Sequence, residues 1–217
     1  VTDMLNKTEI RPVIGLMSGT SADGIDGCIL LTDGQHVKHT DISLCQPYPG
    51  PVEKAIQAAR RDPASFLADP QRRTALINAI TDSHADSVFQ LLRRAAEEGL
   101  PTVQLCGFHG QTIYHQPEAG RTVQLGDGNR LAQLCGLPVI YDFRRADMEA
   151  GGQGAPLAPV YHRILLRQAG CQHPAGFLNL GGIANLTACA DTQLLGFDTG
   201  PANALTDAVC QTELGLP

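Results

Sequence analysis

The sequence lacks any apolar run long enough to cross a membrane. A spanning helix needs about 20 consecutive apolar residues, and no segment of the 217 residues approaches that length. The first twelve residues, VTDMLNKTEIRP, carry no basic segment followed by an apolar core, which is the pattern of a secretory signal. We therefore expect a cytoplasmic protein without a membrane partner.

Paired cysteines and a P-loop are also missing. The seven cysteines are scattered and no C-x-x-C pair occurs, which argues against a disulfide framework and against a cysteine zinc site. The G-x-x-x-x-G-K-[ST] pattern of the P-loop is absent as well. A nucleotide, if one binds, must be held in another way.

Positive charge is scarce. The chain has 16 Lys and Arg against 22 Asp and Glu, a net charge of −6. Sequence-independent binding of nucleic acid needs a basic surface, so we expect no nucleic-acid partner. An acidic protein that handles phosphate must concentrate positive potential locally, through backbone amides, a metal ion or a few arginines.

What the sequence contains is an alternation of strand and helix patterns, read from apolar runs, apolar periodicity and glycine turns. The predicted strands cover residues 10–17, 25–32, 37–44, 102–110, 138–142, 175–182, 184–190 and 194–201. The predicted helices cover residues 52–61, 72–98, 128–137 and 151–168, with a last one from Ala202. Strand triplets followed by helices indicate an α/β fold with mixed sheets.

The strand–turn–strand pattern begins a second time near Pro138. We therefore predict two domains, covering residues 1–137 and 138–217. The two halves share this pattern rather than sequence.

The first unusual segment is IGLMSGTSADGID, residues 14–26, where small polar residues interrupt an apolar run. Glycines at 19 and 24 permit a turn whose amides converge on an anion. Ser18, Thr20 and Ser21 add donors, and Asp23 and Asp26 are suitable ligands for Mg²⁺. The alternative is a polar hairpin loop, for which Asp-Gly is a common signal.

Two histidines, His109 and His115, occur in GFHGQTIYH. Their spacing matches no helical zinc motif. We favour a structural histidine, or one that hydrogen-bonds a polar substrate.

A charged segment, YDFRRADMEAGGQGAP, covers residues 141–156. Arginine binds carboxylates in a bidentate manner, so Arg144 and Arg145 are candidates for substrate binding. A solvated charged loop is the alternative.

The segments NLGGIANL and GFDTGPAN supply a second glycine turn and a carboxylate, Asp198, after an apolar run. Active-site carboxylates of α/β folds often lie at strand ends. The helix that begins after Pro201 offers N-terminal amides to an anion. The alternative role for Asp198 is to cap that helix.

Seven motifs together resemble one family. They are GLMSGTSADGID, GFHGQTIYH, QLGDGN, DFRRAD, GGQGAPL with the following P and YH, NLGGIANLT and FDTGPAN, which span residues 15 to 203 in family order. On these motifs the chain resembles the anhydro-N-acetylmuramic acid kinases. The resemblance implies an actin-like, ribonuclease H-like ATPase fold of two domains, each with a glycine-rich phosphate loop.

The resemblance also implies a reaction. The family uses Mg·ATP to hydrolyse the 1,6-anhydro bridge of 1,6-anhydro-N-acetylmuramic acid and to phosphorylate O6, in cell-wall recycling. By matching position, Asp198 would be the general base and Asp23 the Mg²⁺ ligand. The phosphate loops would comprise Gly19, Thr20, Ser21, Ala22, Asp23, Gly24, Ile25 and Asp26 in the first domain, with Gly181, Gly182 and Asn185 in the second. From their residue types we expect sugar contacts from His109, Gln111, Arg144, Asp147, Gln153 and Asn203.

The chain departs from the family pattern in two ways. Ala202 replaces the glycine of D-T-G-P-G-N, a modest change if its φ is negative. Family members also continue past TELGLP, so we expect the second domain to be incomplete, with apolar faces uncovered. The chain would then dimerise or bind the remainder of the fold.

Three other functions are alternatives. A non-catalytic nucleotide- or sugar-binding fragment that needs a partner stays open, and so does a kinase for another sugar. A serine hydrolase is a poor match, because MSGTS is not the G-x-S-x-G elbow.

Overall fold

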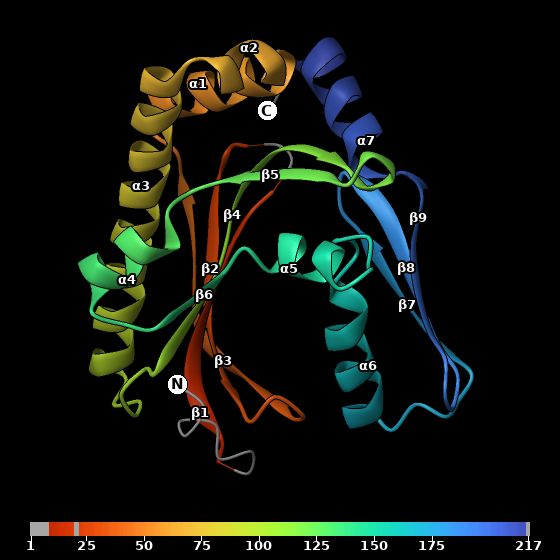
Figure 1. Ribbon diagram of the computed structural model, residues 1–217. Helices are drawn as coiled ribbons and strands as arrows, with labels where there is room; N and C mark the ends of the chain where they lie inside the picture. Colours follow the sequence, from red (N-terminus) through yellow and green to blue (C-terminus); the bar gives the residue numbers. More distant parts are fainter. Residues whose placement is uncertain (1–8, 20–21, 216–217) are drawn as a thin grey trace. The chain divides into compact units, whose positions relative to one another are not determined.

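The computed structural model describes residues 9–19 and 22–215 (Figure 1). The chain divides into two compact units, Val1–Gly154 and Ala155–Pro217. Each unit is described by itself below.

Unit 1 is built on a mixed six-stranded sheet in the order β3-β2-β1-β4-β5, with β6 also paired to β4. β1 is antiparallel to β2 and parallel to β4, and β6 is parallel to β4. The strands are β1 (Arg11–Ser18), β2 (Gly24–Thr32), β3 (Val37–Pro47), β4 (Leu105–Gln116), β5 (Arg121–Leu125) and β6 (Val139–Tyr141).

Three helices of unit 1 begin directly after an aspartate that caps them. Asp62, Asp69 and Asp127 each accept a hydrogen bond from the backbone N–H three residues later, which satisfies a free amide of the first turn. The helices are α1 (Gly50–Arg61), α2 (Pro63–Ala68), α3 (Pro70–Glu97), the 3-10 turn η2 (Pro117–Ala119), α4 (Gly128–Cys135) and α5 (Phe143–Glu149).

The long helix α3 supplies much of the core of unit 1. Its buried side chains recur at three- and four-residue spacing and contact β2 and β3. Leu76, Ile80, Val88 and Leu91 lie in the same apolar cluster as Ile14 of β1.

Unit 2 has a three-stranded antiparallel sheet in the order β7-β8-β9. Its elements are α6 (Ala158–Gln168), β7 (Ala175–Leu180), β8 (Ile183–Cys189), β9 (Leu194–Pro201), α7 (Asn203–Val209) and the π-helical turn η3 (Cys210–Leu214). Helix α6 packs on one face of this sheet. His162 stacks on Phe177 at 4.1 Å between ring centroids, and its Nδ1 lies 2.7 Å from the Thr187 hydroxyl.

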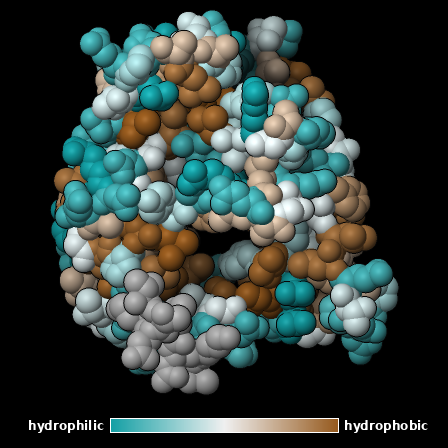
Figure 2. Space-filling view, in the orientation of Figure 1, coloured by the Kyte–Doolittle hydropathy of each residue, from teal (hydrophilic) through white to brown (hydrophobic). Residues whose placement is uncertain are grey.

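The opposite face of the β7-β8-β9 sheet carries exposed apolar side chains. Cross-strand partners share a face in an antiparallel sheet, and the register places Leu178 opposite Leu186 and Leu186 opposite Phe197. Leu178 is 56% exposed and Phe197 is 48% exposed. The space-filling view shows hydrophobic residues, in brown, at the surface among hydrophilic ones (Figure 2). We call Leu178, Leu180, Leu195 and Phe197 the open face.

The predicted α/β class with mixed sheets and flanking helices is confirmed. The division of the chain differs from the predicted boundary near Pro138, because β6 pairs with β4 and so belongs to the first sheet. The strand expected to turn near residue 110 runs on to Gln116, paired with β5. The helix expected from residue 151 begins at Ala158, after Pro156 has restricted the residue before it.

Among the described residues, no helix is both long enough and apolar enough to span a membrane.

Candidate functional site

The first glycine segment forms the turn between β1 and β2. The backbone of Ala22 is left-handed, with a φ of 60°, and its side chain is fully buried. Gly24 is needed for a close approach, because a Cβ there would lie 2.6 Å from the Gln46 carbonyl oxygen. The side chain of Ile25 is also fully buried. A ligand at Ala22 or Ile25 would therefore meet backbone rather than side chains.

The two ends of this turn are tied by hydrogen bonds. The Ala22 N–H donates to the Gly19 carbonyl (3.2 Å), and the Tyr48 N–H donates to the Asp23 carbonyl (3.0 Å). Two predicted contacts, Thr20 and Ser21, lie outside the described residues. We call the described ends, Gly19 and residues 22–24, the first loop.

Ser18, Tyr48 and Gln111 lie beneath the first loop, and none of the three is more than 4% exposed. The Tyr48 hydroxyl donates to Ser18 Oγ (3.0 Å), and Gln111 Nε2 donates to the Gly19 carbonyl (3.0 Å). Ser18 Oγ contacts both the Gly24 carbonyl (2.9 Å) and Gln111 Oε1. Gln111 was expected to contact sugar, but its amide is occupied by the loop and by Ser18.

Two exposed carboxylates belong to this region. Asp23 lies in the first loop, and Asp26 lies within β2 opposite Cys45, where it raises the pKa of that thiol. Hard carboxylate oxygens suit Mg²⁺, which needs only one or two protein carboxylates. No group of three or more metal-ligating side chains occurs among the described residues, so the zinc interpretation of His109 and His115 gains no support.

His109 on β4 and Arg144 on α5 form a second cluster. Arg144 Nε donates to His109 Nε2 (2.8 Å), and its Nη1 donates to the Gly154 carbonyl (2.7 Å). The histidine must accept at Nε2, so its proton is on Nδ1, which lies 2.8 Å from the Gly110 carbonyl. Burial, followed by the nearby Arg144 charge, lowers the pKa of His109 to about 4. His109 is therefore a neutral acceptor that orients the guanidinium.

Arg144 differs from its neighbour Arg145. Arg145 pairs with Asp142 and, at 3.9 Å, with Glu149. Both hydrogen-bond partners of Arg144 are neutral, and no carboxylate pairs with it among the described residues. Burial lowers the pKa of Arg144, yet arginine stays charged at neutral pH. Arg144 thus keeps an uncompensated positive charge suited to an anion.

Asp147 and the glycine-rich turn after α5 complete this cluster. Asp147 Oδ2 accepts from the Gly154 N–H (2.8 Å), and its carbonyl accepts from the Gly152 N–H (2.8 Å). Asp147 was expected to contact sugar; its carboxylate holds the turn that Arg144 also contacts. Gln153 is exposed in the same turn.

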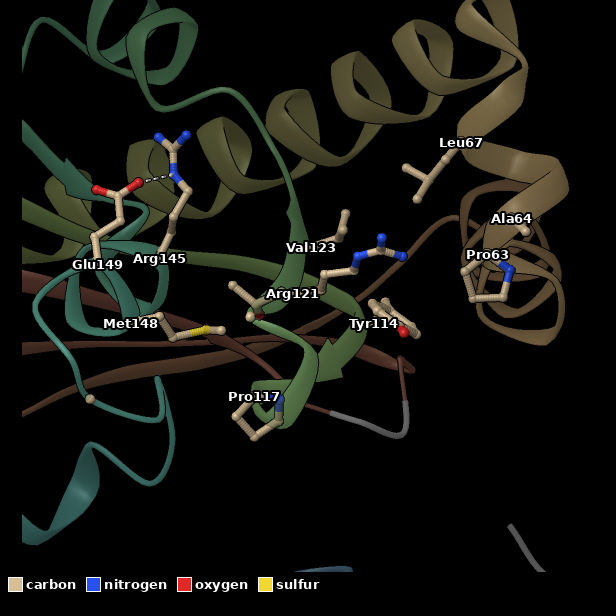
Figure 3. A pocket seen from close by; sticks show the side chains of 13 residues that line it. Pro63, Ala64, Leu67, Tyr114, Pro117, Arg121, Val123, Arg145, Met148 and Glu149 are labelled. Atoms are coloured by element: carbon tan, nitrogen blue, oxygen red, sulfur yellow. Dashed lines mark ion pairs between the residues drawn. The ribbon is translucent and has the colours of Figure 1, made fainter.

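A pocket of about 620 Å³ borders α5, α2 and the β4–β5 hairpin (Figure 3). Its walls are mostly apolar, with Leu67, Val123 and Met148 among them, and the Arg145–Glu149 ion pair lies at one side. Of the residues predicted to bind substrate, Arg145 lines it.

The second glycine turn, Gly181–Gly182, joins β7 to β8. The N–H groups of Ala202 and Asn203 donate to the Gly182 and Gly181 carbonyls at 3.0 and 2.9 Å, and Asn203 Nδ2 donates to the Leu180 carbonyl at 2.9 Å. The expectation that the N-terminal amides of α7 face an anion is therefore wrong for these residues, because the glycine turn uses them. The side-chain amide nitrogen of Asn203 likewise donates to a backbone carbonyl.

Asp198 lies on β9, exposed, and does not cap α7, whose N-cap is Ala202. The register pairs Asp198 with Asn185 and Asn185 with Asn179, so the three form a polar row on one face of the sheet. Asn185, expected in the phosphate turn, is thus a strand residue beside the carboxylate. Ala202 has a negative φ, −128°, so it does not adopt the left-handed backbone that favours glycine.

A family model described as anhydro-N-acetylmuramic acid kinase matches residues 11–217. The chain belongs to this family. Relatives of that name include those of Rhizorhabdus wittichii, 45% identical over 208 residues, and Gluconobacter oxydans, 42% identical over 210. Each alignment covers 94% of this chain and 56% or 57% of the relative. The chain therefore spans about half the length of the curated relatives it matches.

Two solved structures are more distantly similar. An exopolyphosphatase-like protein aligns with a TM-score of 0.41 at 14% identity, covering 95% of this chain and 55% of that one. A glucokinase from Parabacteroides distasonis aligns with a TM-score of 0.32 at 17% identity, covering 88% and 48%.

The neutral state of His109 predicts how stability depends on pH. The unfolded chain binds a proton on this histidine near pH 6.5, whereas the folded chain binds it near pH 4. The free energy of unfolding should therefore fall as the pH drops through this window, by up to about 1.4 kcal/mol per pH unit for this one group. Urea unfolding at a series of pH values should show a shallower acid slope for His109→Gln.

The control is His39→Gln, because His39 is exposed on β3. His84 and His162, whose pKa values burial also lowers, contribute the same sign in every variant. Equal acid slopes for His109→Gln and the natural chain would contradict a neutral buried His109.

Proposed function

We propose that this chain forms part of a cytoplasmic kinase that opens 1,6-anhydro-N-acetylmuramic acid and phosphorylates it with Mg·ATP. The products are N-acetylmuramic acid 6-phosphate and ADP, as cell-wall recycling requires. The observation that carries the proposal is the family match over residues 11–217. A coupled assay of ADP release with Mg·ATP and the anhydro sugar tests it.

In this proposal Asp198 is the general base. It accepts a proton from water as the water oxygen bonds to C1 of the sugar and the C1–O6 bond breaks. The electron pair of that bond stays on O6, which attacks the γ-phosphorus of ATP and expels ADP. One proton is released to solvent. Asp198 is exposed on β9, beside Asn185, so its carboxylate is accessible to a water molecule.

The phosphate groups are bound mainly by backbone. The first loop offers amides in a turn fixed by Ala22 and Gly24, and Gly181–Gly182 forms the second turn. Mg²⁺, held by Asp23, would neutralise charge on the transferred phosphoryl group. Stabilisation of that charge, rather than covalent chemistry, is what phosphoryl transfer demands of the protein.

Arg144 is the group proposed to bind the lactyl carboxylate of the sugar. Its guanidinium is oriented by His109 and by the Gly154 carbonyl and has no acidic partner among the described residues. In this assignment His109 and Asp147 orient Arg144 and the turn, while the exposed side chains of Gln153 and Asn203 are the proposed contacts to sugar hydroxyls.

Turnover by this chain alone is a separate question, since it spans about half the length of its curated relatives. A binding-only fragment would retain affinity for Mg·ATP without releasing ADP. A kinase for another sugar would release ADP with free N-acetylmuramic acid in place of the anhydro form.

Substitution of Asp198 tests the proposed base. Asp198→Asn keeps the shape and removes the proton acceptor, so ADP release should fall by about 10²- to 10⁴-fold. Binding of Mg·ATP, measured by calorimetry, should be unchanged. The matched control is Asp191→Asn, an exposed aspartate before β9, which should retain activity. Full activity in Asp198→Asn would exclude this residue as the base.

The two adjacent arginines give a second test. Arg144→Gln should weaken binding of the anhydro sugar by about 10- to 100-fold, because a charge-assisted hydrogen bond is lost. Arg145→Gln removes a charge that Asp142 and Glu149 already compensate, so it should change sugar affinity little. Equal losses in both variants would show a general electrostatic effect instead.

We also propose that a second copy of the chain covers the open face, as a homodimer. Its apolar side chains are each about half exposed, and contiguous exposed apolar area favours association. Sedimentation equilibrium should give a dimer whose dissociation constant rises at least about tenfold in Leu180→Asp. The control is Asn179→Asp, its neighbour on the other face of β7. A monomer at all concentrations would contradict this proposal.

A further inference from the structure

We propose that Ser18, Tyr48 and Gln111 form a buried positioning cluster that holds the first loop in the shape it needs to bind phosphate. The ligand named here rests on the proposed function, but the hydrogen bonds of the cluster do not. The assignment changes the role of Gln111, from a sugar contact to a residue that acts through the loop.

The cluster joins three segments that are distant in the sequence. Ser18 ends β1, Tyr48 follows β3 and Gln111 lies in β4, where the register pairs it with Ser18. The parallel pairing of β1 with β4, in the middle of the sheet (Figure 1), brings Ser18 and Gln111 together. The loop is thereby tied to the core rather than to the surface.

The donors and acceptors of the cluster match one another. Burial raises the pKa of Tyr48 to about 12, so its hydroxyl stays protonated and donates to Ser18 Oγ. The single Ser18 proton is shared between Gln111 Oε1 and the Gly24 carbonyl. The Gln111 amide donates to the Gly19 carbonyl and, at 3.3 Å, to the Thr112 carbonyl. Both ends of the first loop are thus bound by side chains of the cluster.

The loop needs such support because its backbone is strained. A non-glycine residue in the left-handed region, as Ala22 is, is strained and persists only where the surroundings enforce it. The cluster fixes the Gly19 and Gly24 carbonyls on either side of Ala22. Without it, the backbone is free to relax and to turn its amides away from an anion.

Two substitutions remove the hydrogen bonds without removing the packing. Tyr48→Phe deletes the hydroxyl that donates to Ser18, and Gln111→Leu deletes the amide. The matched control is Tyr114→Phe, which loses a hydroxyl bonded to Gln116 away from the loop. All three variants would be made in the full chain, and circular dichroism would check that each one folds.

The rate of amide hydrogen exchange measures how firmly the backbone of the first loop is held. The Ala22 and Tyr48 amides donate within the loop region, and in both cluster variants we expect their exchange to rise about 5- to 10-fold, the effect of one net hydrogen bond. Amides of α3 should be unchanged. Mg·ATP should bind about 5- to 10-fold more weakly, whereas affinity for the anhydro sugar should stay within about twofold.

Unchanged exchange at Ala22 and Tyr48, or an equal rise throughout α3, would overturn the positioning role. Weaker sugar binding with normal Mg·ATP binding in Gln111→Leu would return Gln111 to the sugar site and also overturn it. If the natural chain binds no Mg·ATP, the proposed function fails, and the exchange of the two amides alone decides the inference.

Discussion

The parallel pairing of β1 with β4 is the constraint on which the candidate site depends. It brings Ser18 and Gln111 together at the end of the first strand, where Tyr48 completes a buried hydrogen-bond cluster. Beyond Gln111, the same strand β4 pairs with β5. Two residues before Gln111, His109 on β4 accepts a hydrogen bond from Arg144. One strand therefore supports both the first loop and the arginine.

The polar side chains of this region differ in how far other protein groups already pair with them. The hydrogen-bond partners of Arg144 are neutral, so its positive charge is not compensated. The charge of Arg145 is compensated by ion pairs with Asp142 and Glu149. Asp147 binds backbone amides of a turn. Desolvated polar groups need partners, so much of this polarity serves geometry, whereas the two carboxylates proposed for the chemistry, Asp23 and Asp198, are exposed.

Sequence patterns predicted most of the elements because caps, prolines and apolar periodicity are local signals; the Asp127 cap of α4 is one instance. They did not predict that Gln111 and Ser18 meet, because this contact joins residues on separate strands. They also missed α5, since FRRADME reads equally as a charged loop, and its helix is supported by contacts to Gly154 and His109. Tyr48 carried no recognisable signal, because its hydroxyl acquires a partner only in the folded sheet.

The most direct test of the central claim is phosphorus NMR of this chain with Mg·ATP and 1,6-anhydro-N-acetylmuramic acid. We predict that the γ-phosphate signal is replaced by a phosphomonoester resonance coupled to the two protons on C6 of the sugar, with ADP in equal amount. An absence of conversion would show that residues 1–217 do not turn over alone, whereas conversion of the γ-phosphate to inorganic phosphate alone would contradict the proposed sugar phosphorylation.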